Sequence, residues 1–172
     1  VLCQNKAVAA TMIEGGAFDP LDKGCLQDSI SASTQCIAAL FSACSSPEFK
    51  LRLGQLDVAK TLLTVANEGK HTDEQVYIFI SKTVAMLAVD KQSCAFLRTE
   101  AVGRMLFSFI SANENVECGR WLSIAVQNIA ADHTDHPTFC SYGLFAALQK
   151  LHSLDDATGV ISAASAATAR IM

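Results

Sequence analysis

The sequence predicts an all-α fold, a helical solenoid of about four repeats with three helices each, and three observations predict it. Apolar residues recur at the 3.6-residue period of an α-helix rather than at the two-residue period of a strand. This helical pattern itself recurs about every 42 residues along the chain. Only 3 Pro and 9 Gly occur among 172 residues, which leaves room for long uninterrupted helices.

The clearest helical stripe belongs to a long helix within residues 116–132. Its members are Cys118, Leu122, Ala125, Val126 and Ile129. The equivalent stripes of the other long helices superpose without a gap, with steps of 44, 42 and 42 residues. The positions that superpose are Leu40, Val84, Val126 and Thr168. Such repetition is the signature of stacked supersecondary units, each of which contacts its neighbours.

Middle helices repeat with the same period, which defines the domain organisation. Leucines recur at equivalent positions, Leu62, Leu106 and Leu148, whereas Asp22 stands where the first repeat should carry a leucine. We therefore predict one domain over residues 1–172, with repeats of approximately 5–45, 46–90, 91–132 and 133–172. Because the first residue is Val rather than Met, the chain is expected to be an excerpt of a longer protein.

Stop and start signals place the helices of the first two repeats. A helix should end near Glu14, break at Gly15–Gly16 and restart at about Ala17. A long amphipathic helix is predicted over residues 28–45. Ser46 and Pro47 then open a short helix as cap and first helical residue. A middle helix should cover residues 56–66.

The remaining helices follow the same pattern. After a polar turn at 67–70, Thr72 or Asp73 should cap a long helix that runs to about residue 90. Residues 91–132 predict a short, a medium and a long helix, separated at 99–100 and 113–115. A polar break at 132–135 precedes a short helix that starts at Pro137. The last helix should begin near Asp155 and Asp156.

Composition excludes several classes of partner and location. The formal charge of −4 comes without a basic tract, so nucleic acid is not expected. Its 7 cysteines are odd in number and form no CxxC pair, which favours free thiols in a reducing, cytoplasmic setting. No apolar run approaches the ~20 residues that span a bilayer, and no leader is visible.

Two segments of the sequence resemble the armadillo repeat family. Residues 12–21, MIEGGAFDPL, are similar to that family's junction between its first and second helices. Residues 125–130, AVQNIA, are similar to the end of its third helix. HEAT and other two-helix solenoids are the nearest alternatives, but the short first helix of each unit favours armadillo. The resemblance implies a right-handed α-α superhelix that acts as a non-enzymatic scaffold for protein binding.

The same resemblance implies where a partner would bind. Third helices should line a concave groove, in which Asn128 would clamp the backbone of an extended peptide. The equivalents of Asn128 are Ser42, Met86 and Arg170, so the asparagine ladder of import receptors and catenins occurs once. The positions that carry tryptophan in import receptors hold Ala38, Lys82, Ile124 and Ala166. This difference argues against recognition of classical nuclear signals.

Two aromatic residues on the third helices are candidate anchors. Phe79 and Trp121 lie off the inward stripes, one repeat apart, and could form a shelf for an apolar or proline-rich side chain. They could equally pack against a neighbouring helix. Asn128 could likewise be a solvated or capping residue rather than a peptide contact. The predicted groove residues are Phe79, Lys82, Met86, Arg120, Trp121, Ile124, Gln127, Asn128 and Arg170. The partner would be a protein segment, either an extended peptide or a helix.

Catalytic and metal-binding constellations are not expected. Residues 132–136, DHTDH, with Cys140 suggest ligands, but a zinc site needs a second half that the sequence lacks. No GxSxG, HExxH or glycine-rich phosphate loop occurs. We therefore predict no enzyme activity, no metal and no cofactor.

Two alternative functions stay open from the sequence. The chain stops at Ile171–Met172 inside a predicted third helix, and an uncapped solenoid end exposes apolar surface that could mediate self-association. The resemblance also allows a structural or regulatory domain of a larger cytoskeletal or signalling protein. Such a domain would bind a small GTPase or another part of its own chain.

Overall fold

The computed structural model describes residues 11–130 and residue 149, and this part of the chain is all-α, with no strand. A short helical segment at residues 11–14 precedes the labelled helices. These are α2 (Phe18–Cys25), α3 (Ile30–Ala43), α4 (Pro47–Gln55), α5 (Val58–Glu68), α6 (Glu74–Val89), α7 (Lys91–Leu97), α8 (Glu100–Ala112) and α9 (Val116–Ile129). The predicted division of residues 91–132 into a short, a medium and a long helix is confirmed.

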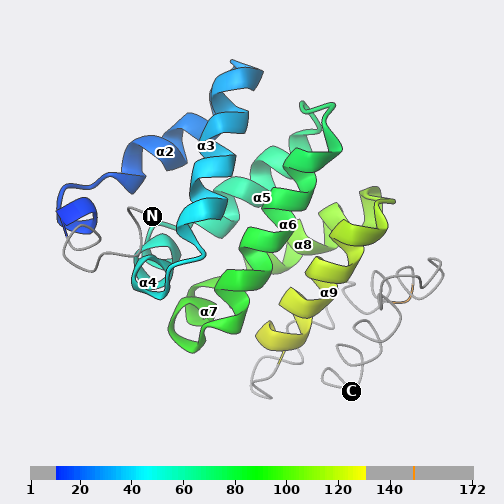
Figure 1. Ribbon diagram of the computed structural model, residues 1–172. Coiled ribbons are helices and arrows are strands. Elements are labelled where there is room, and N and C mark those ends of the chain that lie inside the picture. The colour runs from blue at the N-terminus through cyan, green and yellow to red at the C-terminus, as the bar shows by residue number, and fades with distance from the viewer. Residues whose placement is uncertain (1–10, 131–148, 150–172) are drawn as a thin grey trace.

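Helices of the same rank in successive repeats pack side by side (Figure 1). The long third helices α3, α6 and α9 form one layer, in which α6 lies between the other two. The second helices α2, α5 and α8 stack in the same order, and the first helices α4 and α7 contact each other. Each labelled helix therefore contacts its equivalent in a neighbouring repeat, as expected of a solenoid.

Local signals set the ends of these helices where the sequence predicted them. Gly16 breaks the chain before α2 with a φ of 66°, a conformation that glycine adopts without a steric penalty. Asp73 caps α6 by accepting a hydrogen bond from the Gln75 amide at 2.9 Å. Asn115 caps α9 in the same way, accepting from the Cys118 amide at 3.1 Å.

Four predicted helix ends in the first two repeats are wrong by about two residues. Helix α3 covers Ile30–Ala43 rather than residues 28–45, and α5 covers Val58–Glu68 rather than residues 56–66. Helix α5 starts later than predicted because Leu56 still caps the C-terminus of α4, and Asp57 then adopts a left-handed conformation with a φ of 54°. Ser46 does precede α4, but its hydroxyl donates to the Glu48 carboxylate at 2.6 Å instead of capping the helix.

The predicted inward stripes form the core. Leu40, Val84 and Val126 are all 0% exposed, as are the repeating leucines Leu62 and Leu106. Periodicity in the sequence therefore located these five core positions correctly. At about 25 cal/mol per Å² of buried apolar surface, these stripes are the main stabilising contribution to the stacking of the repeats.

Cysteines contribute to this core as small apolar side chains. The described cysteines are free, and Cys25, Cys44 and Cys118 are buried. Burial raises the pKa of both the Cys25 and the Cys44 thiol to about 12, which keeps them protonated and unreactive.

The first repeat departs from the leucine pattern at Asp22 in α2. This carboxylate is half-buried, and one of its oxygens, Oδ1, is buried without a hydrogen-bond partner. Burial raises its pKa, while a hydrogen bond from Thr61 acts in the opposite direction. An aspartate at the position that holds leucine in the later repeats therefore weakens the packing between α2 and α5.

Other predictions lie outside the described residues. The fourth repeat (133–172), the candidate ligands in 132–140 and the C-terminal end all fall there. Within residues 11–130 no helix has both the length and the apolar character to cross a membrane. In that same stretch no group of three or more potential metal ligands converges.

Candidate functional site

The third-helix face, defined as the partly exposed side chains of α3, α6 and α9, carries a charged and aromatic cluster. Lys82 of α6 reaches across to α9, where its Nζ lies 2.7 Å from Oε1 of Glu117. Both side chains are partly accessible, at 25% and 44%. This ion pair connects two successive repeats on the face where the sequence predicted partner binding.

Trp121 lies at the centre of this cluster. The Lys82 ammonium lies 5.6 Å from the centre of the indole ring, and the Arg120 guanidinium lies 5.9 Å from it. Both distances are those of cation–π interactions. The indole N–H is buried without a well-formed hydrogen bond. Lys82, Trp121 and Arg120, which the sequence predicted individually, are therefore brought together.

The charges of the cluster lower the pKa of the Glu117 carboxyl. Hydrogen bonding from Lys82 is the largest cause, and the Trp121 indole and Arg120 act in the same direction. Glu117 is therefore ionised at neutral pH and holds the Lys82 side chain over the indole ring. The sequence prediction missed Glu117, because its partner lies 35 residues away on a neighbouring helix.

Phe79 lies apart from this cluster. Its ring stacks on Phe41 of α3, with 4.8 Å between ring centres and 18° between ring planes. The side chain is half-buried and packs against the core. Phe79 thus adopts the arrangement that the sequence left open as an alternative, in which the aromatic packs against a neighbouring helix.

Asn128 lies on α9, about two turns beyond Trp121, and is half-buried. Its side-chain amide donates to the carbonyl of Ile124 in its own helix at 2.8 Å. An asparagine amide has two N–H donors and one acceptor oxygen, so this bond leaves one N–H and the oxygen for a partner. Ser42, its equivalent on α3, likewise donates to the Ala38 carbonyl at 2.9 Å.

The other predicted groove residues have less distinctive surroundings. Met86 and Ile124 are half-buried and pack against the core. Gln127 is also half-buried, on α9. Arg170 lies outside the described residues.

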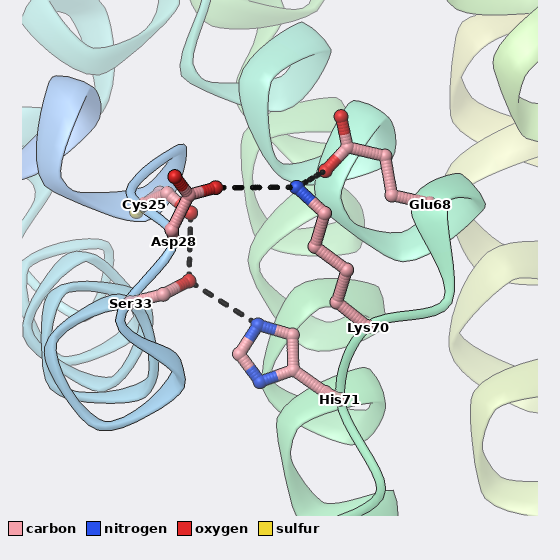
Figure 2. Close-up of polar contacts among 6 residues, drawn as sticks. All are labelled: Cys25, Asp28, Ser33, Glu68, Lys70 and His71. Carbon is pink, nitrogen blue, oxygen red and sulfur yellow. Dashed lines mark hydrogen bonds and ion pairs between the residues drawn. The ribbon is translucent and has the colours of Figure 1, made fainter.

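A second polar cluster, which was not predicted from the sequence, joins the first two repeats (Figure 2). His71, in the connection between α5 and α6, is 6% exposed. Its Nε2 lies 3.2 Å from the Ser33 hydroxyl of α3, and its Nδ1 lies 3.4 Å from the Thr34 hydroxyl. Because Ser33 donates its only proton to the Cys25 carbonyl at 2.6 Å, it must accept from Nε2–H.

This arrangement holds His71 as the neutral Nε2–H tautomer, with Nδ1 free to accept from Thr34. Burial lowers the pKa of His71 below its ordinary value near 6.5, and Asp73 acts in the opposite direction. Next to it, Lys70 Nζ pairs with Glu68 at 3.2 Å and with Asp28 at 4.0 Å (Figure 2). The chain itself therefore supplies both the imidazole and the cation at this contact between repeats.

We expect His71 to make the protein less stable as the pH falls below about 6.5. The unfolded chain binds a proton at the ordinary pKa, whereas the folded chain binds it only at a lower pH. The free energy of unfolding should therefore decrease through 6.5 and level off below the folded pKa. Urea titrations between pH 7.5 and 5 would measure this slope, with His71→Gln as the control. Equal slopes in the two proteins would contradict the prediction.

Comparison of the structure with solved structures identifies the fold. A crystal structure of computationally designed armadillo repeat proteins for modular peptide recognition matches with a TM-score of 0.78 and 23% identity, over 95% of this chain and 68% of that one. A designed armadillo repeat protein in complex with the peptide (KR)4 matches with a TM-score of 0.77 and 22% identity, over 98% of this chain and 70% of that one.

No protein-family model and no curated protein matches the sequence. The likeness to these designed proteins is thus one of structure at low sequence identity, and it agrees with the three-helix repeats described above. The predicted fold class is confirmed: the chain folds as an armadillo-like right-handed helical solenoid.

Proposed function

We propose that this protein is a non-enzymatic recognition module that binds an extended peptide segment of a protein partner along the third-helix face. The observation that carries this proposal is the cluster of Lys82, Glu117, Arg120 and Trp121 across α6 and α9. It places a carboxylate, two cations and an aromatic ring on one partly exposed surface. Aromatic and arginine side chains dominate binding energy at protein interfaces.

The surroundings of the cluster suit an extended peptide. The remaining N–H and oxygen of the Asn128 amide match the donor and acceptor of a peptide unit. Arg120 is exposed and could bind a carbonyl or carboxylate, while the Trp121 ring could contact an apolar side chain. Stacked helices hold these groups in fixed positions, so little entropy is lost on binding.

Two further observations support the proposal. The designed armadillo proteins of the same fold are described as made for modular peptide recognition, and one was solved with the peptide (KR)4. The free, buried thiols of Cys25 and Cys44 suit a reducing compartment such as the cytoplasm, where a scaffold of this kind would act.

Selection from a library of random peptides tests the proposal. The wild-type protein should enrich a family of related sequences. A synthetic peptide of that family should bind Trp121→Ala/Asn128→Ala at least about tenfold more weakly, because an interface anchor of this kind contributes about 2 kcal/mol or more. The Kd would be measured by isothermal titration calorimetry.

Phe96→Ala is the matched control, because it removes a partly exposed aromatic ring (37%) on the first helix α7, next to Gly54 of α4, and none of the predicted groove residues. Circular dichroism melts would establish that all variants are folded. The proposal fails if wild type enriches no peptide family, or if a folded Trp121→Ala/Asn128→Ala variant binds as tightly as the Phe96→Ala control.

A further inference from the structure

The edge of the solenoid, where second helices turn into third helices, differs between successive repeats. At the first junction, the α2–α3 turn lies beside the α5–α6 turn, which has five residues (69–73). This turn is long enough to place His71 against Ser33 of α3 (Figure 2). The neighbouring Thr34 hydroxyl contacts the same imidazole. Side chains of the chain itself therefore fill the space between these two repeats.

The second junction, between the α5–α6 turn and the α8–α9 turn, is open. The α8–α9 turn has only three residues (113–115), so it has no residue equivalent to His71. Tyr77 of α6 takes the place of Ser33, which lies 44 positions earlier. In front of Tyr77 there is a pocket of about 490 Å³. Tyr77 thus lines the pocket, whereas its equivalent Ser33 contacts His71 at the first junction.

This pocket combines an apolar wall with an acidic rim. Tyr77 and Phe109 line it with their rings, whose centres lie 6.0 Å apart at an angle of 43°. Glu74 and Glu114 line it as well, and Glu74 is held in place by a hydrogen bond from the Asn115 side-chain Nδ2 at 3.0 Å. Among the described residues that line the pocket there are two carboxylates, and none of the side chains is a cation.

Helix ends do not cancel this negative charge. The α6 and α9 N-termini lie nearby, but the side chains of Asp73 and Asn115 already cap N–H groups there. The α5 and α8 C-termini contribute Ala66, Asn67 and Ala112 to the lining, and the negative end of a helix dipole favours a cation. At the first junction Lys70 supplies this cation, paired with Asp28 and Glu68.

We propose that the pocket at the second junction binds the guanidinium group of an arginine side chain from a protein partner. A guanidinium is planar, so it can stack on the Tyr77 or Phe109 ring, and its N–H donors match the carboxylates of the rim. At the first junction His71 supplies a planar group and Lys70 supplies a cation. At the second junction one guanidinium group from a partner would supply both. It is a site separate from the third-helix cluster.

Titration with N-acetylarginine amide, followed by two-dimensional ¹H–¹⁵N NMR, tests this site directly. Saturable shifts are expected at Gly69, Asn113 and Asn115. N-acetylcitrulline amide has nearly the same shape without the charge and should bind at least about tenfold more weakly, because hydrogen bonds to charged groups are the stronger ones. The double variant Glu74→Gln/Glu114→Gln should lose a similar factor, while the amide oxygen introduced at position 74 could still accept from Asn115.

Trp121→Ala separates this site from the proposed peptide-binding face. The variant should bind N-acetylarginine amide as wild type does, even where it has lost its selected peptide. Absence of saturable shifts at the pocket in wild type would overturn the proposal. So would equal binding of the citrulline compound, or unchanged arginine binding by a folded Glu74→Gln/Glu114→Gln variant.

Discussion

Leu62→Ala should lower the free energy of unfolding by about 2–5 kcal/mol. The Leu62 side chain is 0% exposed and belongs to α5, which packs against α2, α4, α6 and α8. Helices on several sides restrict collapse into the space that the missing atoms leave, so the loss should include a cavity cost as well as a transfer cost. Urea denaturation followed by circular dichroism at 222 nm would measure it.

Lys60→Ala is the matched control on the same helix. Its side chain is exposed, so the substitution should change the free energy of unfolding by no more than about 0.5 kcal/mol. Repeats interact mainly with their neighbours, so the destabilised first repeats can unfold before the others. In that case Leu62→Ala should also broaden the urea unfolding transition. A loss below about 1 kcal/mol for Leu62→Ala would show that α5 is not at the centre of the core.

Predictions from the sequence are confirmed where the signal, such as apolar periodicity or a capping residue, lies within a single helix. The period of 42–44 residues located Leu40, Val84 and Val126, and all three are fully buried. Capping residues also act within one turn, which is why Asp73 could be predicted at the start of α6 and the break at 113–115 before α9. A boundary failed where Asp57 adopted a left-handed conformation that no local rule anticipates.

Contacts between helices were less predictable. The stacking of Phe79 on Phe41 and the pairing of Lys82 with Glu117 depend on the offset between neighbouring third helices. Periodicity within a helix gives the direction of a side chain but not its height relative to the next helix. Lys82, Arg120 and Trp121 were therefore predicted on one face, whereas the ion pair that organises them was not.

One signal for the second junction was present in the sequence. The polar turn before α6 is two residues longer than the turn before α9, and the extra length carries His71 into the contact between repeats. Comparison of turn lengths between aligned repeats would have indicated that one junction is filled and the other open. Helix periodicity contains no such information, because it describes the helices and not their connections.

The contact between first helices should be as sensitive to added volume as the core is to lost volume. A Cβ atom at Gly54 of α4 would lie 3.2 Å from the Ser93 Cα of α7 and 3.0 Å from the Phe96 ring. Gly54→Val adds two further carbons in that space, so α4 and α7 must separate. We expect a loss of about 2–3 kcal/mol in the free energy of unfolding, within the range for overpacked sites.

Gly54→Ala distinguishes this steric effect from the higher helix propensity of residues other than glycine. Alanine favours the helix over glycine by about 0.5–1 kcal/mol, which should offset a small displacement of the partly exposed Phe96 ring. The alanine variant should therefore lie within about 1 kcal/mol of wild type in urea denaturation, while the valine variant is clearly destabilised. Equal stability of the two variants would mean that the backbones of α4 and α7 do not approach closely at Gly54. The first helices would then contribute little to the stacking of repeats.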